Sequence, residues 1–146
     1  MMKESKPNSN TIEAAEADYL YVGISQLPFS GNGLFTAIDI YKDEVIAVFK
    51  GEILSDLQAK QRVKKGTDQY FISMLDGTIM DSMKIDCFAK YANDVKGSLK
   101  PEFKNCSKIA LDEANDVAII ATRNIKSGEE IFCGYGLEYW KKHRTT

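Results

Sequence analysis

The fold class is decided by residues 30–54, whose sequence is SGNGLFTAIDIYKDEVIAVFKGEIL. Two apolar runs rich in β-branched and aromatic residues, GLFTAIDI and EVIAVFKGEIL, flank the turn residues Lys42 and Asp43. Short runs of this kind, bounded by turn signals, predict β-strands. A glycine turn, GNG at residues 31–33, precedes the first run. The region therefore predicts a strand-rich meander that opens at a glycine turn.

The flanking residues continue this pattern. Upstream, residues 19–27 (YLYVGISQL) predict another strand. Downstream, Ser55 is a suitable N-cap for a helix over residues 56–65, and Gly66 is a suitable residue to end it. The predicted helix carries several charges and little apolar surface, so we expect it on the outside of the protein.

The second half of the chain is also dominated by short strands. The DG pair at 76–77 lies between two apolar stretches and predicts a hairpin. Residues 86–95 (DCFAKYANDV) predict a short helical turn, and residues 106–125 predict two strands around DEAND. The SG pair at 127–128 leads into a last short strand, and residues 137–144 (LEYWKKHR) predict one or two helical turns. The pattern favours a mainly-β fold.

Length and composition indicate one domain. The chain has 146 residues, a formal net charge of −2, 44% apolar side chains and 27% charged side chains, values typical of a single soluble domain. Residues 1–18 have few large apolar groups and predict a flexible N-terminal segment, with one domain over residues 19–146. No apolar run approaches the ~20 residues of a membrane span. We expect a cytoplasmic protein, or a nuclear one if the source is eukaryotic, with no membrane partner.

The charge and the cysteines disfavour several functions. A slightly acidic chain lacks the basic excess of a nucleic-acid binder, so we expect no direct nucleic-acid partner. Cys87, Cys106 and Cys133 form no C-x-x-C pair, and the single histidine is His143, so we expect no zinc site and disfavour a Cys/His hydrolase. The basic runs at 60–65 and 141–144 predict either a solvated helix face or a docking surface for an acidic partner.

The glycine turn and Tyr135 are each weak signals alone, because the first can be a structural turn and the second a half-buried strand tyrosine. Their order along the chain is more specific. The turn and strand of residues 30–54 are followed by FAKYANDV, by NC at 105–106 and by IATRNIKSGEEIFCGYG. In this order and spacing the chain resembles the SET-domain family of protein lysine methyltransferases, above all its minimal single-domain members. The matching residues are Gly31, Gly33, Gly51, Glu52, Ala89, Asn93, Asn105, Arg123, Ile125, Gly128, Glu129, Glu130 and Tyr135.

The resemblance implies a fold and a cofactor. The fold is the family's β-clip of small curved sheets, with a few short helices and a C-terminal segment threaded beneath an earlier loop. The cofactor is S-adenosyl-L-methionine. In the family pattern its methionine part contacts the backbone of the glycine turn and the side chain of Asn93. Its adenine contacts the main chain of the next residue and an aromatic ring. The implied cofactor-binding residues here are Gly31, Asn32, Gly33, Leu34, Asn93, Asp94, Tyr139 and Trp140.

The resemblance also implies the chemistry. Methyl transfer needs a neutral amine, whereas free lysine at pH 7 is almost entirely an ammonium ion. A narrow apolar channel lowers the pKa of lysine by desolvation, so neither a metal nor a histidine base is needed. Tyr135 is the implied catalytic residue and, with Phe49 and Cys133, lines the implied substrate channel. Because Phe49 and Cys133 offer little to hold a water molecule, we expect di- or trimethyl-lysine products.

Three departures from the family pattern leave an alternative open. Asp94 and Val95 stand where the family has His and Ser, the link from Asn93 to Asn105 is longer, and Gly134 replaces an Asp. The alternative function is a catalytically inactive SET-like module that binds proteins. In the main interpretation the partner is a lysine-containing protein substrate, and the enzyme is a monomer or a homodimer.

Overall fold

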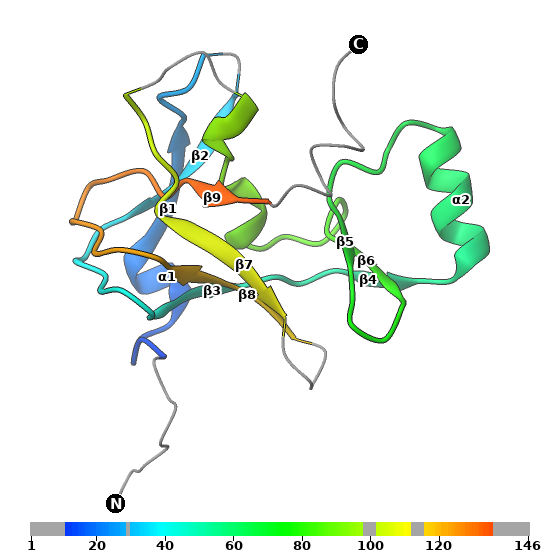
Figure 1. Ribbon diagram of the computed structural model, residues 1–146, viewed down its shortest axis with the longest axis horizontal. Helices are drawn as coiled ribbons and strands as arrows, with labels where there is room; N and C mark the ends of the chain where they lie inside the picture. Colours follow the sequence, from blue (N-terminus) through cyan, green and yellow to red (C-terminus); the bar gives the residue numbers. More distant parts are fainter. Residues whose placement is uncertain (1–10, 29, 98–101, 112–115, 136–146) are drawn as a thin grey trace, which may run out of the picture.

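The computed structural model describes residues 11–28, 30–97, 102–111 and 116–135 (Figure 1). Its helices are short, and strands dominate, so the predicted mainly-β class is confirmed. The strands are β1 (Leu20–Ile24), β2 (Asn32–Thr36), β3 (Val45–Val48), β4 (Glu52–Leu54), β5 (Phe71–Ser73), β6 (Ile79–Asp81), β7 (Ser107–Leu111), β8 (Val117–Ala121) and β9 (Cys133–Gly134). The helices are α1 (Glu16–Tyr19) and α2 (Asp56–Lys64), with 3-10 turns η1 (Ala89–Tyr91) and η2 (Val95–Gly97).

The strands form three small sheets. β1 and β2 pair as a two-stranded ribbon, β3-β8-β7-β9 form a four-stranded sheet, and β4-β6-β5 form a three-stranded sheet. The paired strands are antiparallel except β9, which lies parallel to β7. In Figure 1, α2 and the β4-β6-β5 sheet lie at one end of the molecule, and the other two sheets lie at the opposite end. The last described strand therefore joins a sheet built by earlier segments.

The apolar run EVIAVFKGEIL forms two strands in different sheets rather than one continuous strand. β3 pairs with β8, whereas β4 pairs with β6. The chain changes sheet at Gly51, where a side-chain Cβ would lie 2.6 Å from the carbonyl oxygen of Asp81. Such an approach leaves room for hydrogen alone. The apolar pattern could not show this break because both halves are hydrophobic.

The predicted helix and hairpin are confirmed. Ser55 caps α2 through a capping box with Gln58, which satisfies two backbone N–H groups at the helix start. Arg62, on the same helix, donates from Nη1 to Glu52 at 2.9 Å and to Asp81 at 2.8 Å. These two ion pairs attach the helix to the β4-β6-β5 sheet, whose β5–β6 hairpin turns at the predicted DG pair.

The N-terminal segment contacts the rest of the protein at residues that precede 19, the predicted start of the domain. Thr11 forms a parallel bridge with Val45, and the backbone N–H of Val48 donates to Glu16 at 3.0 Å. Thr11 and Glu16, within the segment predicted to be flexible, therefore contact β3. The reason is an acidic side chain that pairs with backbone, which the low apolar content of the segment did not indicate. Residues 1–10 lie outside the described part of the chain.

The hydrophobic core lies between the β1-β2 ribbon and the β3-β8-β7-β9 sheet. Its largest fully buried aliphatic side chains are Leu34, Ile40, Ile46, Ile119, Ile125 and Ile131. Burial of one such side chain contributes roughly 1.5–3 kcal/mol to folding. Ile40 and Ile125 also exchange backbone hydrogen bonds of 2.8 and 2.7 Å. This pairing holds the segment before β9 beside the segment that follows β2.

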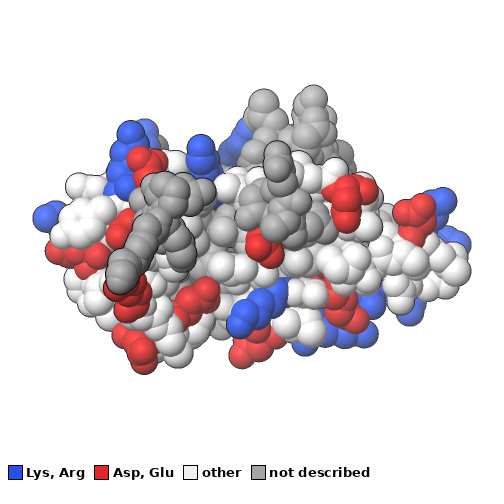
Figure 2. All heavy atoms as spheres, turned by 90° about the horizontal axis from the view of Figure 1, so that it is seen from below, with Lys and Arg blue, Asp and Glu red and all other residues white. Residues whose placement is uncertain are grey.

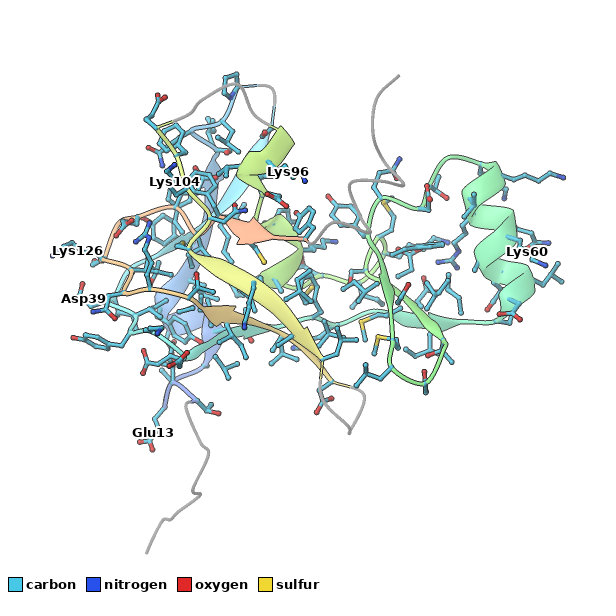
Figure 3. All side chains as sticks on the ribbon, in the orientation of Figure 1. Glu13, Asp39, Lys60, Lys96, Lys104 and Lys126 are labelled. Atoms are coloured by element: carbon cyan, nitrogen blue, oxygen red, sulfur yellow. The ribbon has the colours of Figure 1, made fainter. Side chains whose placement is uncertain are left out.

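The surface carries both signs of charge. Figure 2 shows acidic and basic side chains interspersed over the face that it presents. Figure 3 shows Lys60 on α2 at one end of the molecule and Lys126 at the other. Within the described ranges no helix has the length and apolarity needed to cross a membrane.

Candidate active site

The glycine turn leads into β2 and has its backbone accessible on one side. Gly31 has a φ of +64°, and no atom lies within 4 Å of the place a Cβ would occupy. Its carbonyl accepts a 2.8 Å hydrogen bond from the backbone N–H of Ser25. Asn32 is exposed. The turn thus presents main-chain groups next to open space, which is the arrangement that a backbone-bound ligand requires.

Gly33 faces the other way, toward a buried carboxylate. A Cβ at this position would lie 2.2 Å from Oε2 of Glu130, and Glu130 is 2% exposed. The carboxylate accepts hydrogen bonds from Oγ of Ser25 at 2.7 Å and from the backbone N–H of Gln26 at 2.8 Å. It therefore fixes the segment that precedes the turn and leaves no room for a side chain at Gly33.

The role of Glu130 was not evident from the sequence. It matches the family pattern, but an acidic pair after a Ser-Gly turn is typical of a solvated loop. Only its contacts with residues more than 100 positions away show that it supports the site. A buried carboxylate needs such donors to offset its desolvation.

Asn93 connects the glycine turn to the end of the described chain. Its Nδ2 donates to the backbone carbonyl of Asn32 at 3.0 Å. Its own carbonyl accepts a 2.8 Å hydrogen bond from the backbone N–H of Cys133. The resemblance implies that Asn32 and Asn93 bind the cofactor and that Cys133 lines the substrate channel, and the structure brings these three residues together.

Tyr135 is held at both ends. Its hydroxyl donates a short hydrogen bond to the carbonyl oxygen of Ala92. Its backbone N–H donates to Oδ2 of Asp94 at 2.8 Å. The side chain is half-buried and packs against the core. Tyr135 therefore lies against the same segment, residues 92–94, that contacts the glycine turn.

The two other channel candidates lie in the core against which Tyr135 packs. Phe49 is 9% exposed and Cys133 is fully buried. Burial raises the pKa of the Cys133 thiol to about 12, although a hydrogen bond from Ser107 acts in the opposite direction. Burial therefore favours the protonated thiol of Cys133 over the thiolate, which is the nucleophilic form.

Leu34 is less suited to a cofactor contact than its neighbours. Its side chain is fully buried, and its carbonyl accepts a 2.7 Å hydrogen bond from the backbone N–H of Ile131. Tyr139 and Trp140, the expected adenine contacts, lie outside the described residues, as does His143.

Lys90 supports the segment before Asn93. Its Nζ donates to the carbonyls of Ser82, Met83 and Ile85 at 3.2, 3.4 and 3.0 Å. The same ammonium lies 5.7 Å from the ring centre of Tyr91, within cation–π range. Lys90 thus ties η1 to the loop after β6.

The described ranges contain no group of three or more His, Cys, Asp or Glu side chains placed to hold a metal ion. The absence of a zinc site in the whole protein remains a prediction, because His143 falls outside these ranges.

The fold and the grouped residues define a class of protein. The family model for the SET domain matches residues 31–136, which is more than half of the chain. The chain therefore belongs to the SET-domain family, and the resemblance and the fold predicted from it are confirmed.

Similar proteins are named as histone-lysine methyltransferases. The chain is 26% identical over 136 residues to histone-lysine N-methyltransferase EZH2 of Chaetomium thermophilum. It is 27% identical over 128 residues to an H3 lysine-36 specific histone-lysine N-methyltransferase of Coccidioides immitis. These matches cover 86% and 83% of this chain, but only 9% and 12% of the two relatives. The chain thus spans about a tenth of their length.

Solved structures show the same likeness. An active polycomb repressive complex 2 in the basal state contains a chain with a TM-score of 0.67 and 26% identity, covering 81% of this chain and 15% of that one. An apo ctPRC2 with mutations in Ezh2 gives a TM-score of 0.64 and 28% identity, covering 84% of this chain and 16% of that one.

Proposed function

We propose that this protein is an S-adenosyl-L-methionine-dependent protein-lysine N-methyltransferase. The observation that carries the proposal is the meeting of three distant segments, in which Asn93 contacts the glycine turn and its neighbours Ala92 and Asp94 hold Tyr135. Family membership supports the same conclusion. The site thus combines groups suited to a cofactor with a tyrosine suited to orient an amine.

The glycine turn fits the amino-acid end of S-adenosyl-L-methionine. That end carries an ammonium and a carboxylate, which need hydrogen-bond acceptors and donors respectively. Main-chain groups at Gly31 and Asn32 offer both, and the open space beside Gly31 leaves them approachable. Asn93 has a carboxamide directed at the same turn. When bound, the cofactor supplies a methyl group on a positively charged sulfur.

The protein's own contribution is to present a neutral amine in line with that methyl group. A lysine side chain that enters an apolar channel loses hydration, which lowers its pKa and favours the neutral form. Tyr135 donates its hydroxyl proton to Ala92, and a phenolic oxygen in this state still accepts hydrogen bonds. It can therefore accept an N–H of the amine and direct the lone pair. Alignment of this kind accounts for a large part of catalysis in transfer reactions.

We propose a protein lysine as substrate. The named relatives act on histone lysines, which supports a histone as the first substrate to test. Because histones are nuclear, this supports the nuclear alternative if the source is eukaryotic. The comparisons lend no support to a cytoplasmic location.

The test separates an enzyme from a binding module. The full chain is titrated with S-adenosyl-L-methionine by calorimetry and then incubated with core histones, using acetylated histones as the control substrate. We expect binding, and methyl transfer only to the unmodified histones or to another lysine-bearing protein. Binding without transfer to any protein supports the inactive module. No binding overturns the proposal.

Replacement of Asn93 tests the cofactor site. Asn93→Ala removes the carboxamide that contacts Asn32, so we expect S-adenosyl-L-methionine to bind about 1–3 kcal/mol more weakly. Asn124→Ala is the matched control, because Asn124 is an exposed asparagine that bonds to the backbone of Lys42 outside the site. Equal affinities in the two variants would remove Asn93 from the cofactor site.

A further inference from the structure

Asp94 is a buried carboxylate between Tyr135 and its neighbours. It is 8% exposed. Its Oδ2 accepts the backbone N–H of Tyr135 at 2.8 Å. Its Oδ1 accepts Nδ2 of Asn105 at 2.8 Å and the backbone N–H of Lys96 at 2.9 Å. Hydrogen bonds to an ionised acceptor are roughly twice as strong as neutral ones, so this carboxylate is well suited to hold backbone in place.

The orientation of the Asn105 side-chain amide is fixed by a neighbouring backbone group. Its Oδ1 accepts the backbone N–H of Val95 at 3.0 Å. Because that oxygen is committed to a donor, Nδ2 must face Asp94. Rotation of the amide by a half turn would set two N–H donors against each other at Val95. The pair thus requires an acceptor at position 94 and a donor at position 105.

We infer that Asp94 is a positioning residue that sets the backbone of Tyr135, an inference that rests on the proposed function. Tyr135 follows directly after β9, so its N–H lies just beyond the short ladder that pairs Cys133 and Gly134 with β7. The Asp94 bond continues the support of the chain by one residue. Together with the bond from the hydroxyl to Ala92, it fixes both ends of the tyrosine. A displacement of about 1 Å in a reacting geometry can cost about 100-fold in rate.

The test exchanges the two side chains. Asp94→Asn places an amide against the three donors that the described residues direct at this side chain, so its own NH₂ group must face an N–H. Asn105→Asp places a second carboxylate beside the first. In the double variant the donor and acceptor change places, and the amide oxygen introduced at position 94 can still accept the N–H of Tyr135. Lys96 is exposed, so water can accept its N–H. Asp86→Asn, at an exposed aspartate, is the matched control.

Two readouts are needed, and one of them is independent of activity. In the free protein, the Tyr135 amide proton resonance should move upfield and broaden in Asp94→Asn, because the new amide is neutral and offers Tyr135 an acceptor in only one of its two orientations. In the double variant the aspartate at position 105 fixes that orientation, so a single sharp resonance should return, still upfield of the wild-type position. In the methyl-transfer assay we expect kcat to fall by about 10- to 100-fold in each single variant. The dissociation constant of S-adenosyl-L-methionine should stay unchanged, because the contact expected between residue 94 and adenine involves the main chain alone. The double variant should recover most of kcat.

Several outcomes overturn the inference. They are an unchanged kcat in Asp94→Asn, a loss of kcat that the double variant does not recover, and a loss explained by weaker cofactor binding alone. If Asp94→Asn fails to fold, Asn105→Asp is compared with the double variant instead. A loss of kcat in Asn105→Asp that the double variant recovers, at unchanged cofactor affinity, supports the inference, and any other result overturns it. A wild-type protein that transfers no methyl group refutes the proposed function instead, and the amide resonance then still tests the contact.

Discussion

Two hydrogen bonds decide what Tyr135 can do, one from its hydroxyl to Ala92 and one from its N–H to Asp94. The first orients the ring and leaves the oxygen able to accept a further bond. The second fixes the backbone from which the ring projects. The candidate site therefore depends on hydrogen bonds that fix the position of Tyr135, in addition to those that fix Asn93.

Removal of the Tyr135 hydroxyl should separate catalysis from binding. In Tyr135→Phe we expect kcat to fall by about 100-fold or more, because a hydrogen-bonding group placed at the transition state is lost. Cofactor affinity should not change, since the ring remains. Single-turnover assays and calorimetry check both quantities. Tyr41→Phe, at a tyrosine that is 57% exposed, is the control. Full activity in Tyr135→Phe would contradict the catalytic assignment.

We expect the side chains proposed for the channel to determine how many methyl groups are added. Phe49 has no hydroxyl, and the Cys133 thiol is a weak donor, so neither should hold a water molecule where a further methyl group would go. We expect di- or trimethyl-lysine in mass spectra taken with excess cofactor. Phe49→Tyr should shift the product toward monomethyl-lysine, whereas Phe71→Tyr, on β5, should not. A wild-type product that stops at monomethyl-lysine refutes this expectation.

Among the secondary-structure elements, the glycine turn and β2 are held in place by the segment that follows Gly128. Glu130 bonds to Ser25 and Gln26, and Ile131 bonds to the carbonyl of Leu34. The turn thus depends on contacts from a late part of the chain as well as on its own pairing with β1.

Gly33→Ala should damage this support. Its methyl group would lie 2.2 Å from Glu130, and overpacking of this kind costs about 1–3 kcal/mol or more. We expect a lower free energy of unfolding in urea together with weaker cofactor binding. Gly23→Ala is the control, because the added Cβ would meet only the Phe35 ring, at 3.1 Å, and a ring can shift. Equal stability of the two variants would show that Glu130 moves freely.

For the whole molecule, the three sheets are small, and stability depends on groups buried where the sheets meet. Burial is the main cause that raises the pKa of Cys133 from 9.0 to about 12, and that of Tyr19 from 10.0 to about 12, with Glu16 and Glu44 adding to the shift at Tyr19. Tyr19 donates its hydroxyl proton to the carbonyl of Ile46 at 2.7 Å. Both groups are neutral in the folded protein.

Stability should therefore fall in alkaline solution. Above pH 9 the unfolded chain loses these protons while the folded chain keeps them, so the unfolded state binds fewer protons and the free energy of unfolding decreases as pH rises. The stabilisation is complete below the ordinary pKa values and is lost toward pH 12. Urea unfolding from about pH 8 to about pH 11 measures the slope. Tyr19→Phe should make the slope shallower above pH 10, and a flat profile in the wild type would contradict the burial of these groups.

Local patterns in the sequence predicted the capped helix at Ser55, the hairpin at 76–77 and the strands of β7 and β8, because caps, turns and alternating burial act over a few residues. The order of motifs indicated the family and grouped the glycine turn, Asn93 and Tyr135 in one site.

The tertiary structure alone decided the remaining features. It broke EVIAVFKGEIL at Gly51, where the backbone of Asp81 approaches within reach of a Cβ. It buried Glu130 beneath Gly33 and placed Asp94 against Tyr135, which is 41 residues away. The physical reason is that donors from distant segments, such as Ser25 for Glu130 and Tyr135 for Asp94, help to offset the cost of burying a carboxylate. Which segments meet is set by the packing of the whole chain.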